Sequence, residues 1–177
     1  MEIMTHVFFS LLALFICCIL VVPVVCDAAQ QISVPEGNLP LITLERTRCY
    51  GNCPVYSLTL YKNGTVIYVG EYYVKEEGLG IGNISTQKLE YLMDYIPSLG
   101  FFSFNDTYIS YDCTDMPYAI TTVRTDDKTK QVEHYYGDFS APQNLTYLEA
   151  AIDQVVNVTQ WTEPYNSWDY SYNEDLL

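Results

Sequence analysis

Basic side chains are scarce in this sequence. Its 177 residues include 8 Lys and Arg against 22 Asp and Glu, which gives a formal net charge of −14 with neutral histidine. The few Lys and Arg residues are spread between Arg46 and Lys130 and form no cluster in the sequence. Nucleic-acid phosphates and anionic lipid surfaces attract basic patches. We therefore expect no nucleic-acid partner and no binding to a membrane surface through charge.

Motifs that usually carry catalysis or bind ions are also missing. Gly78, Gly80 and Gly82 are spaced like a phosphate-binding loop, but no Lys-Ser/Thr pair follows them. The sequence has no Gly-x-Ser-x-Gly elbow and no EF-hand spacing. His134 is the one histidine beyond the N-terminal segment, and its setting favours a solvated or hydrogen-bonded strand residue. We predict no catalytic residue, no metal site and no cofactor, with the cysteines discussed below as the one alternative.

The N-terminal segment lacks charge for a long stretch. Residues 7–25 are uncharged, and Cys26 and Ala28 are small residues at positions −3 and −1 of a cleavage site after Ala28. This pattern predicts a secretory signal peptide over residues 1–28. The run is also close to the ~20 residues that span a bilayer. An uncleaved N-terminal membrane anchor is therefore the alternative, and a lipidated Cys26 is a third interpretation. All three place the remaining chain outside the cytoplasm, either secreted or anchored to the outer face of the cell membrane.

Glycosylation acceptor triplets are more frequent than composition explains. Chance predicts roughly one Asn-x-Ser/Thr triplet in a chain of this composition. Five are present, at Asn63, Asn83, Asn105, Asn144 and Asn157. Since such triplets accept N-linked glycans in secreted proteins, the excess predicts a glycosylated exterior.

Hydrophobic periodicity predicts an α+β fold in the middle of the chain. Alternating residues indicate strands at 41–46, 55–61, 65–74, 118–125 and 130–137. Apolar residues at helical spacing indicate one helix from Ser85 or Thr86 and another near Pro142. We read residues 76–83 as a glycine-rich connection, and the expected order is ββββ-α-ββ-α. The simplest packing is an antiparallel sheet of about six strands with two helices on one face.

The boundaries of this domain follow from composition. Residues 29–40 form a proline-spaced lead-in, residues 41–161 form a single α+β domain, and residues 162–177 form an acidic, aromatic tail that we expect to be flexible.

A two-residue turn at Asn63-Gly64 would fix the register of the hairpin that it joins. Leu60 would then face Ile67, and one side of the hairpin would be aliphatic. The other side would carry Thr59, Tyr61, Val66 and Tyr68. We predict that this Tyr- and Thr-rich face binds a protein or glycan partner, unless the lead-in or the tail covers it.

The stretch "LITLERTRCYGNCPVYSLTLYKNGTVIYVG" (41–70) resembles the start of domain-of-unknown-function family 6438. Members have a strand, a Cys-x-Gly-x-Cys-Pro turn, a "VYS" strand and a glycine hairpin. The resemblance continues through "GFFSFNDTY", "TDMPYAITTV", "KQVEHYYGD" and "LEAAID" and covers residues 41–161. It implies a small, often exported domain with these boundaries, and it implies no activity.

Three cysteines remain after the signal peptide, and their pairing has several solutions. If the strands beside "CYGNCP" pair as a hairpin, Cys49 and Cys53 close its mouth, because opposite Cα atoms can lie about 4.5 Å apart. On the chain-entropy model, a disulfide that closes this short loop stabilises the folded chain by about 2 kcal/mol, whereas a bridge to Cys113 stabilises it by about 4 kcal/mol. Energy favours the long bridge, while geometry and the family pattern favour the short one. In the second case, Cys113 is unpaired or links two chains as a dimer.

The same thiols support two rival interpretations of the chemistry. A thiol–disulfide enzyme would use Cys49 and Cys53, although a strand follows them in place of the usual helix. A zinc site would combine Cys49, Cys53 and Cys113 with His134, although an oxidising compartment competes for the thiols. Our first hypothesis is a non-enzymatic, exported, glycosylated binding module, and the alternative is a thiol-dependent redox protein. A third hypothesis is an inhibitor that inserts residues 76–83 into its partner.

Overall fold

The structure is a computed structural model that describes residues 39–110 and 114–164. All of these residues belong to one compact unit, Pro35–Leu177; the other unit, Met1–Val34, lies outside the described residues. In chain order the elements are β1 (Pro40–Arg46), β2 (Val55–Tyr61), β3 (Thr65–Tyr72), β4 (Gly78–Asn83), α2 (Thr86–Ser98), the 3-10 turn η1 (Phe101–Ser103), β5 (Thr107–Tyr108), β6 (Tyr118–Arg124), β7 (Thr129–Tyr135), α3 (Gln143–Val156) and α4 (Thr159–Thr162).

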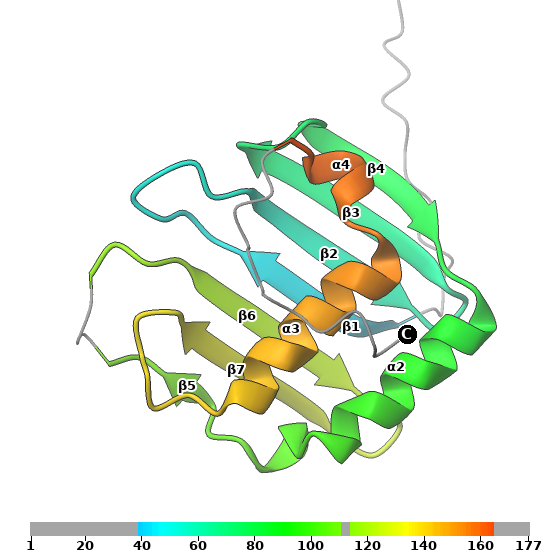
Figure 1. The fold of residues 1–177 in the computed structure, drawn as a ribbon. Coiled ribbons are helices and arrows are strands. Elements are labelled where there is room, and N and C mark those ends of the chain that lie inside the picture. Colours follow the sequence, from blue (N-terminus) through cyan, green and yellow to red (C-terminus); the bar gives the residue numbers. More distant parts are fainter. Residues whose placement is uncertain (1–38, 111–113, 165–177) are drawn as a thin grey trace, which may run out of the picture. The chain divides into compact units, whose positions relative to one another are not determined.

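The strands form one sheet in the order β4-β3-β2-β1-β6-β7-β5. Neighbouring strands run antiparallel, except that β5 runs parallel to β7. The helices α2, α3 and α4 lie on one face of the sheet, as Figure 1 shows. We call the other side, on which the described residues place no helix, the open face. The expected α+β class with helices on one face is therefore confirmed, although the sheet is mixed and has seven strands.

Both long helices begin where the sequence predicts. Ser85 is the N-cap of α2, and its hydroxyl accepts a hydrogen bond from the backbone N–H of Lys88 at 3.2 Å. Pro142 is the N-cap of α3, one residue before the first helical position that we expected it to occupy. The predicted apolar stripes face the sheet: Leu89, Leu92 and Ile96 in α2, and Leu145, Leu148, Ile152 and Val155 in α3, are buried. The expected tail starts too early, because Thr162 is buried in α4.

The predicted register of the β2–β3 hairpin is wrong by one residue. Leu60 pairs with Val66, where the two-residue turn predicted Ile67. The loop has three residues, 62–64: Gly64 donates its N–H to the Tyr61 carbonyl at 2.9 Å and has a φ of 83°. Three-residue hairpin loops commonly end on such a left-handed residue, which favours glycine. Because side chains alternate along a strand, the one-residue shift exchanges the two faces of β3.

The shift removes the binding face that the sequence predicted. Val66 and Tyr68 point into the core with 1% and 0% of their surface exposed, and Tyr61 is buried as well. Of the four residues only Thr59 lies half-buried on the open face. Ile67 and Val69 take the outward positions of β3.

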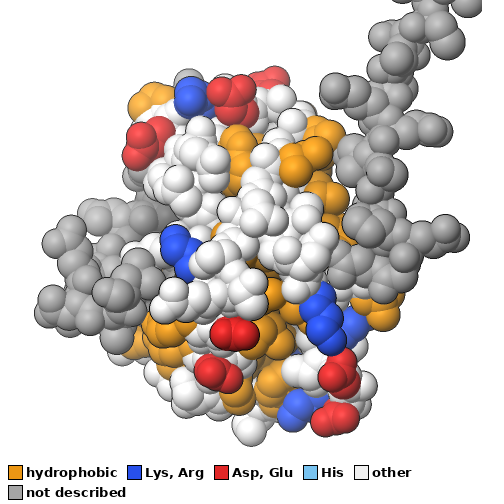
Figure 2. Space-filling model, turned by 90° about the vertical axis from the view of Figure 1, so that its right-hand side faces the viewer, with side chains coloured by type: hydrophobic (Ala, Val, Ile, Leu, Met, Phe, Trp, Pro, Cys, Tyr) orange, Lys and Arg blue, Asp and Glu red, His pale blue; other side chains and the backbone are white. Residues whose placement is uncertain are grey.

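Residues 78–83 form a strand, where a glycine-rich connection was expected. The indole of Trp161 stacks on Tyr68 with ring centroids 4.8 Å apart, and it covers the inner side of β4. A Cβ atom at Gly80 would lie 2.8 Å from the Trp161 Nε1 atom, so this position has no room for a side chain. Leu79 and Ile81 alternate to the open face. Figure 2 views the right-hand side of Figure 1, where β4 lies, and in its upper middle part it shows mainly hydrophobic side chains together with backbone or other uncharged atoms, drawn in white.

Within residues 39–110 and 114–164, no helix is long and apolar enough to cross a bilayer. The proposed signal peptide or anchor falls outside these ranges.

The corrected register makes a testable distinction between adjacent residues. We expect Tyr68→Ala to lower the free energy of unfolding by about 3–5 kcal/mol, because it removes a buried aromatic side chain. Val69→Ala should cost under about 1 kcal/mol, because Val69 is an exposed residue of the same strand. Urea unfolding of the two variants measures both values. The two-residue turn would give the reverse order.

Candidate functional site

Residues 47–54 connect β1 to β2, and we call them the disulfide loop. Cys49 and Cys53 form a disulfide with their Cα atoms 5.8 Å apart. Of the two pairings that the sequence left open, the structure contains the short one. Gly51 lies between them, with its N–H donating to the Cys49 carbonyl at 3.0 Å. Cys113 lies outside the described residues.

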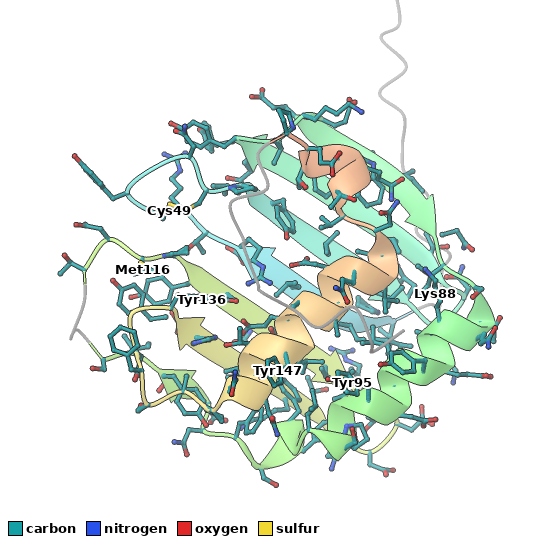
Figure 3. All side chains as sticks on the ribbon, in the orientation of Figure 1. Cys49, Lys88, Tyr95, Met116, Tyr136 and Tyr147 are labelled. Carbon is teal, nitrogen blue, oxygen red and sulfur yellow. A yellow bond between two sulfur atoms is a disulfide. The ribbon has the colours of Figure 1, made fainter. Side chains whose placement is uncertain are left out.

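Hydrogen bonds to the segment before β6 hold the disulfide loop in place. The Tyr50 N–H donates to the Asp115 carbonyl at 2.9 Å, and the Thr47 N–H donates to the Tyr118 carbonyl at 3.0 Å. The Tyr118 N–H in turn donates to the Thr47 hydroxyl at 2.8 Å. The loop is thus fixed at its tip, at its first residue and across its disulfide. Figure 3 shows Cys49 in this loop at the left of the view, whereas Lys88, at the start of α2, lies at the right.

A cleft of about 590 Å³ lies between the disulfide loop and the end of β3. We call it the disulfide cleft; it is lined by Arg48, Cys49, Tyr50, Gly51, Cys53, Val55, Tyr72, Tyr73, Val74 and Glu77. Tyr50 is 88% exposed, and Tyr72 and Tyr73 are about half exposed. The Arg48 guanidinium carbon lies 3.8 Å from the centroid of the Tyr72 ring, within cation–π range. Three exposed tyrosines of the described residues therefore gather at this cleft.

Beneath the loop, an ion network joins β1, β2 and α3. Arg46 is fully buried, and its Nη2 donates to Asp153 Oδ2 at 2.8 Å. Tyr56 donates its hydroxyl to the other oxygen of the same carboxylate at 2.9 Å. Arg46 and Tyr56 are cross-strand partners at the two ends of the loop. One carboxylate on α3 thus binds both strands at the point where the disulfide loop leaves the sheet.

A second carboxylate extends this network toward β7. Glu149 Oε2 lies 3.7 Å from Nη1 of Arg46, and Tyr136 donates its hydroxyl to the same oxygen at 2.5 Å. The Nδ1 atom of His134 lies 3.1 Å from Glu149 Oε1, and its ring stacks on Tyr136 at 4.5 Å. His134 is therefore a buried, hydrogen-bonded strand residue. We name the six side chains the buried ion network: Arg46, Tyr56, His134, Tyr136, Glu149 and Asp153.

Burial shifts the acid–base equilibrium of Asp153. Loss of hydration raises the pKa of this carboxyl, and the Glu149 carboxylate adds to the rise, while Arg46 and Tyr56 act in the opposite direction. A single guanidinium is shared between two buried carboxylates, so it does not offset the cost of ionising both.

The proposed zinc set is not assembled in the structure. Cys49 and Cys53 are consumed by their disulfide, and the third cysteine lies outside the described residues. In the part of the chain that the structure describes, no group of three or more His, Cys, Asp or Glu side chains is placed to hold a metal ion.

Sequence reasoning missed the charged residues of the buried ion network, although two signals were present. Arg46 follows Ile42 and Leu44 at core-facing positions of one strand. Glu149 and Asp153 lie four residues apart within the apolar stripe of α3. Acids and a base at positions that should be apolar predict a buried ion pair, since isolated buried charges are too costly.

The fold and this site define a small α+β domain with one disulfide-closed loop above a buried ion network. Residues 40–156 match the family model DUF6438, a domain of unknown function. Because this match covers more than half of the chain, the protein belongs to that family, as the cysteine turn and the strands after it suggested. No curated protein matches the sequence.

Removing the cation should test the network. We expect Arg46→Met to lower the free energy of unfolding by about 3–5 kcal/mol, because it leaves two buried carboxylates without their positive partner. Arg48→Met is the matched control: Arg48 is exposed, and its ring contact is worth about 1 kcal/mol or less. Equal effects of the two substitutions in chemical denaturation would contradict the assignment.

The raised pKa of Asp153 predicts a direction of pH dependence. The folded protein holds this proton more tightly than the unfolded chain, whose Asp pKa is about 3.9. The stability that it contributes is therefore present at low pH and is lost as the pH rises from about 3.9 through the folded pKa. Asp153→Asn removes this titration. The measured quantity is the difference in the free energy of unfolding, wild type minus Asp153→Asn. This difference should fall as the pH rises above about 3.9. A rise would contradict the raised pKa of Asp153.

Proposed function

We propose that this protein is an exported, non-enzymatic binding module that recognises a protein or glycan partner in the disulfide cleft. The observation that carries the proposal is the grouping of three exposed tyrosines with Arg48 around one stapled loop. Tyrosine and arginine are enriched in the parts of interfaces that contribute most binding energy. Their rings offer a large contact area at a small cost in side-chain entropy.

Rigidity of the loop supports recognition at this place. Arg46 and Tyr56 hold the two ends of the disulfide loop through one carboxylate, and the Cys49–Cys53 bridge closes it. A surface that is already ordered loses little conformational entropy when a partner binds. The cleft thereby replaces the predicted sheet face as the binding surface.

Two features support an exported protein. All five acceptor asparagines, Asn63, Asn83, Asn105, Asn144 and Asn157, are exposed, so each is accessible to glycan addition. The Cys49–Cys53 disulfide suits an oxidising compartment. Both agree with secretion or anchoring outside the cell through the N-terminal segment, and with a glycosylated surface.

The proposal predicts which substitutions abolish binding. The secreted full chain is screened against a glycan array and a displayed peptide library, and the binders are re-measured with variants. We expect Tyr72→Ala and Arg48→Ala to weaken binding by about 30-fold or more, as for residues at the centre of an interface. Tyr91→Ala is the control, because Tyr91 is a comparably exposed tyrosine on α2 outside the disulfide cleft.

Binders that are equally sensitive to all three substitutions would place the site elsewhere. A chain that selects no binder from either screen would contradict the proposal.

A thiol-dependent redox function is the second candidate, because both cysteines line the disulfide cleft. The residues after Cys53 form a strand, whereas thiol–disulfide enzymes usually place their cysteine pair at the N-terminus of a helix. Thiol counts on the folded chain in a glutathione buffer separate the two functions. A disulfide that stays oxidised under mild reduction supports a staple, whereas rapid exchange with unchanged folding supports the redox function.

A further inference from the structure

The two edges of the sheet differ in how they are protected. β5, at one edge, is two residues long, and an ion pair between Lys130 and Asp106 lies beside it. β4, at the other edge, is six residues long, and among the described residues it pairs only with β3. Proteins commonly blunt a long edge with charge, proline or a bulge, because its backbone groups otherwise pair with another chain.

β4 has none of these protections. Gly78–Asn83 contains no charged residue and no proline, and its pairing with β3 runs without a bulge. Its outward side chains are aliphatic, with Leu79 45% and Ile81 61% exposed. They continue the half-exposed Ile67 and the exposed Val69 of the neighbouring strand, so the apolar area reaches the edge. In the view that contains this edge, charged side chains lie mostly above and below the middle (Figure 2).

The hydrogen bonds at the end of β4 show which backbone groups point outward. The Ile84 N–H donates to the Gly64 carbonyl, on the side of β3. Bonding direction alternates along an antiparallel strand. Gly80 and Gly82 therefore bond toward β3, and Leu79, Ile81 and Asn83 direct their N–H and C=O groups to the edge.

We propose that β4 is a pairing edge for a second copy of this chain, joined antiparallel about a twofold axis at Gly80. In this register Leu79 of each copy lies opposite Ile81 of the other copy. The backbone groups that point outward from the two β4 strands then meet as hydrogen-bonded pairs. The aliphatic side chains form cross-strand pairs on the open face. This inference does not rest on the proposed function, although Glu77, next to β4, also lines the disulfide cleft.

Charge complementarity favours a second copy as the occupant. In this register Glu77 lies opposite Asn83, so the acidic end of β4 meets the start of α2 in the other copy. The first turn of α2 contains no acidic residue and contains Lys88. A helix N-terminus and a lysine both attract carboxylates. The contact forms twice, once on each side of the axis.

Glycosylation at Asn83 is compatible with this pairing. Asn83 lies two residues after Ile81 and four after Leu79, so its side chain is on the same face of the strand as theirs. It therefore leaves the sheet on the open face and not in the direction of the edge.

A register-specific cross-link tests the proposal. Leu79→Cys and Ile81→Cys chains are made in a Cys113→Ser background, to remove dimers linked through that thiol. Residue 79 of one copy and residue 81 of the other form a hydrogen-bonded pair, whose Cα atoms are about 5.5 Å apart and within disulfide range. The two copies of residue 79, or of residue 81, are diagonal neighbours at about 7–8 Å, which is beyond that range. Oxidation of the mixture should give the mixed disulfide at least tenfold over either homodisulfide, measured by non-reducing peptide mapping. Equal amounts, or no cross-link, would overturn the register.

Sedimentation of the full chain tests the association itself. The wild type should show a concentration-dependent monomer–dimer equilibrium. Ile81→Pro removes an N–H that points to the edge and spares the bonds to β3, so it should weaken the dimer at least tenfold with the fold retained. Ile81→Lys is a second variant with an intact backbone, and Val69→Lys, which charges the open face one strand inward, is the control.

Three outcomes would overturn the proposal. These are a wild type that stays monomeric at its highest soluble concentration, a dimer that Ile81→Pro and Ile81→Lys leave unchanged, and a monomer that binds an extended peptide along β4.

Discussion

The Asp153 carboxylate is the constraint on which the structure around the site depends. It accepts from Arg46 with one oxygen and from Tyr56 with the other; Arg46 is the last residue of β1, and Tyr56 is the second residue of β2. Glu149 shares the same guanidinium from one turn earlier in α3. Because buried charges are stable only with matched partners, the helix can pack on the sheet in few other positions. We infer that the network gives specificity of packing more than stability.

The position of α3 decides what remains accessible. The helices cover one face of the sheet (Figure 1). The disulfide loop leaves the sheet next to Arg46, whose guanidinium belongs to the buried ion network. A tether at both ends of the loop and a bridge across it present Tyr50 and Arg48 in a defined place. Recognition in the disulfide cleft would depend on aromatic and charged side chains, whereas self-association through β4 would depend mainly on backbone hydrogen bonds.

Local patterns predicted the elements well. The Ser85 cap and the stripe from Leu89 to Ile96 predicted where α2 begins and which side of it faces the sheet, because capping and 3.6-residue periodicity act within a few residues. The helix continues through Pro97 to Ser98, whereas we expected Pro97 to end it. The same locality explains the error at Asn63-Gly64. This pair suits both a two-residue turn and a three-residue loop, and the choice depends on whether Tyr68 or Val69 has a partner across the core. Trp161, almost a hundred residues away along the chain, supplies that partner.

Short-range periodicity by itself determined the α+β class and the order of the main elements. The family resemblance came from the residues of the cysteine turn and the strands after it, and chain geometry together with the family pattern favoured the local cysteine pair. Only tertiary structure decided the face on which Tyr68 lies, that residues 78–83 form an edge strand, and which acids bind Arg46. Each of these depends on contacts between segments far apart in the chain. A local pattern can indicate that a residue is buried, but it does not contain the identity of the residue that lies opposite.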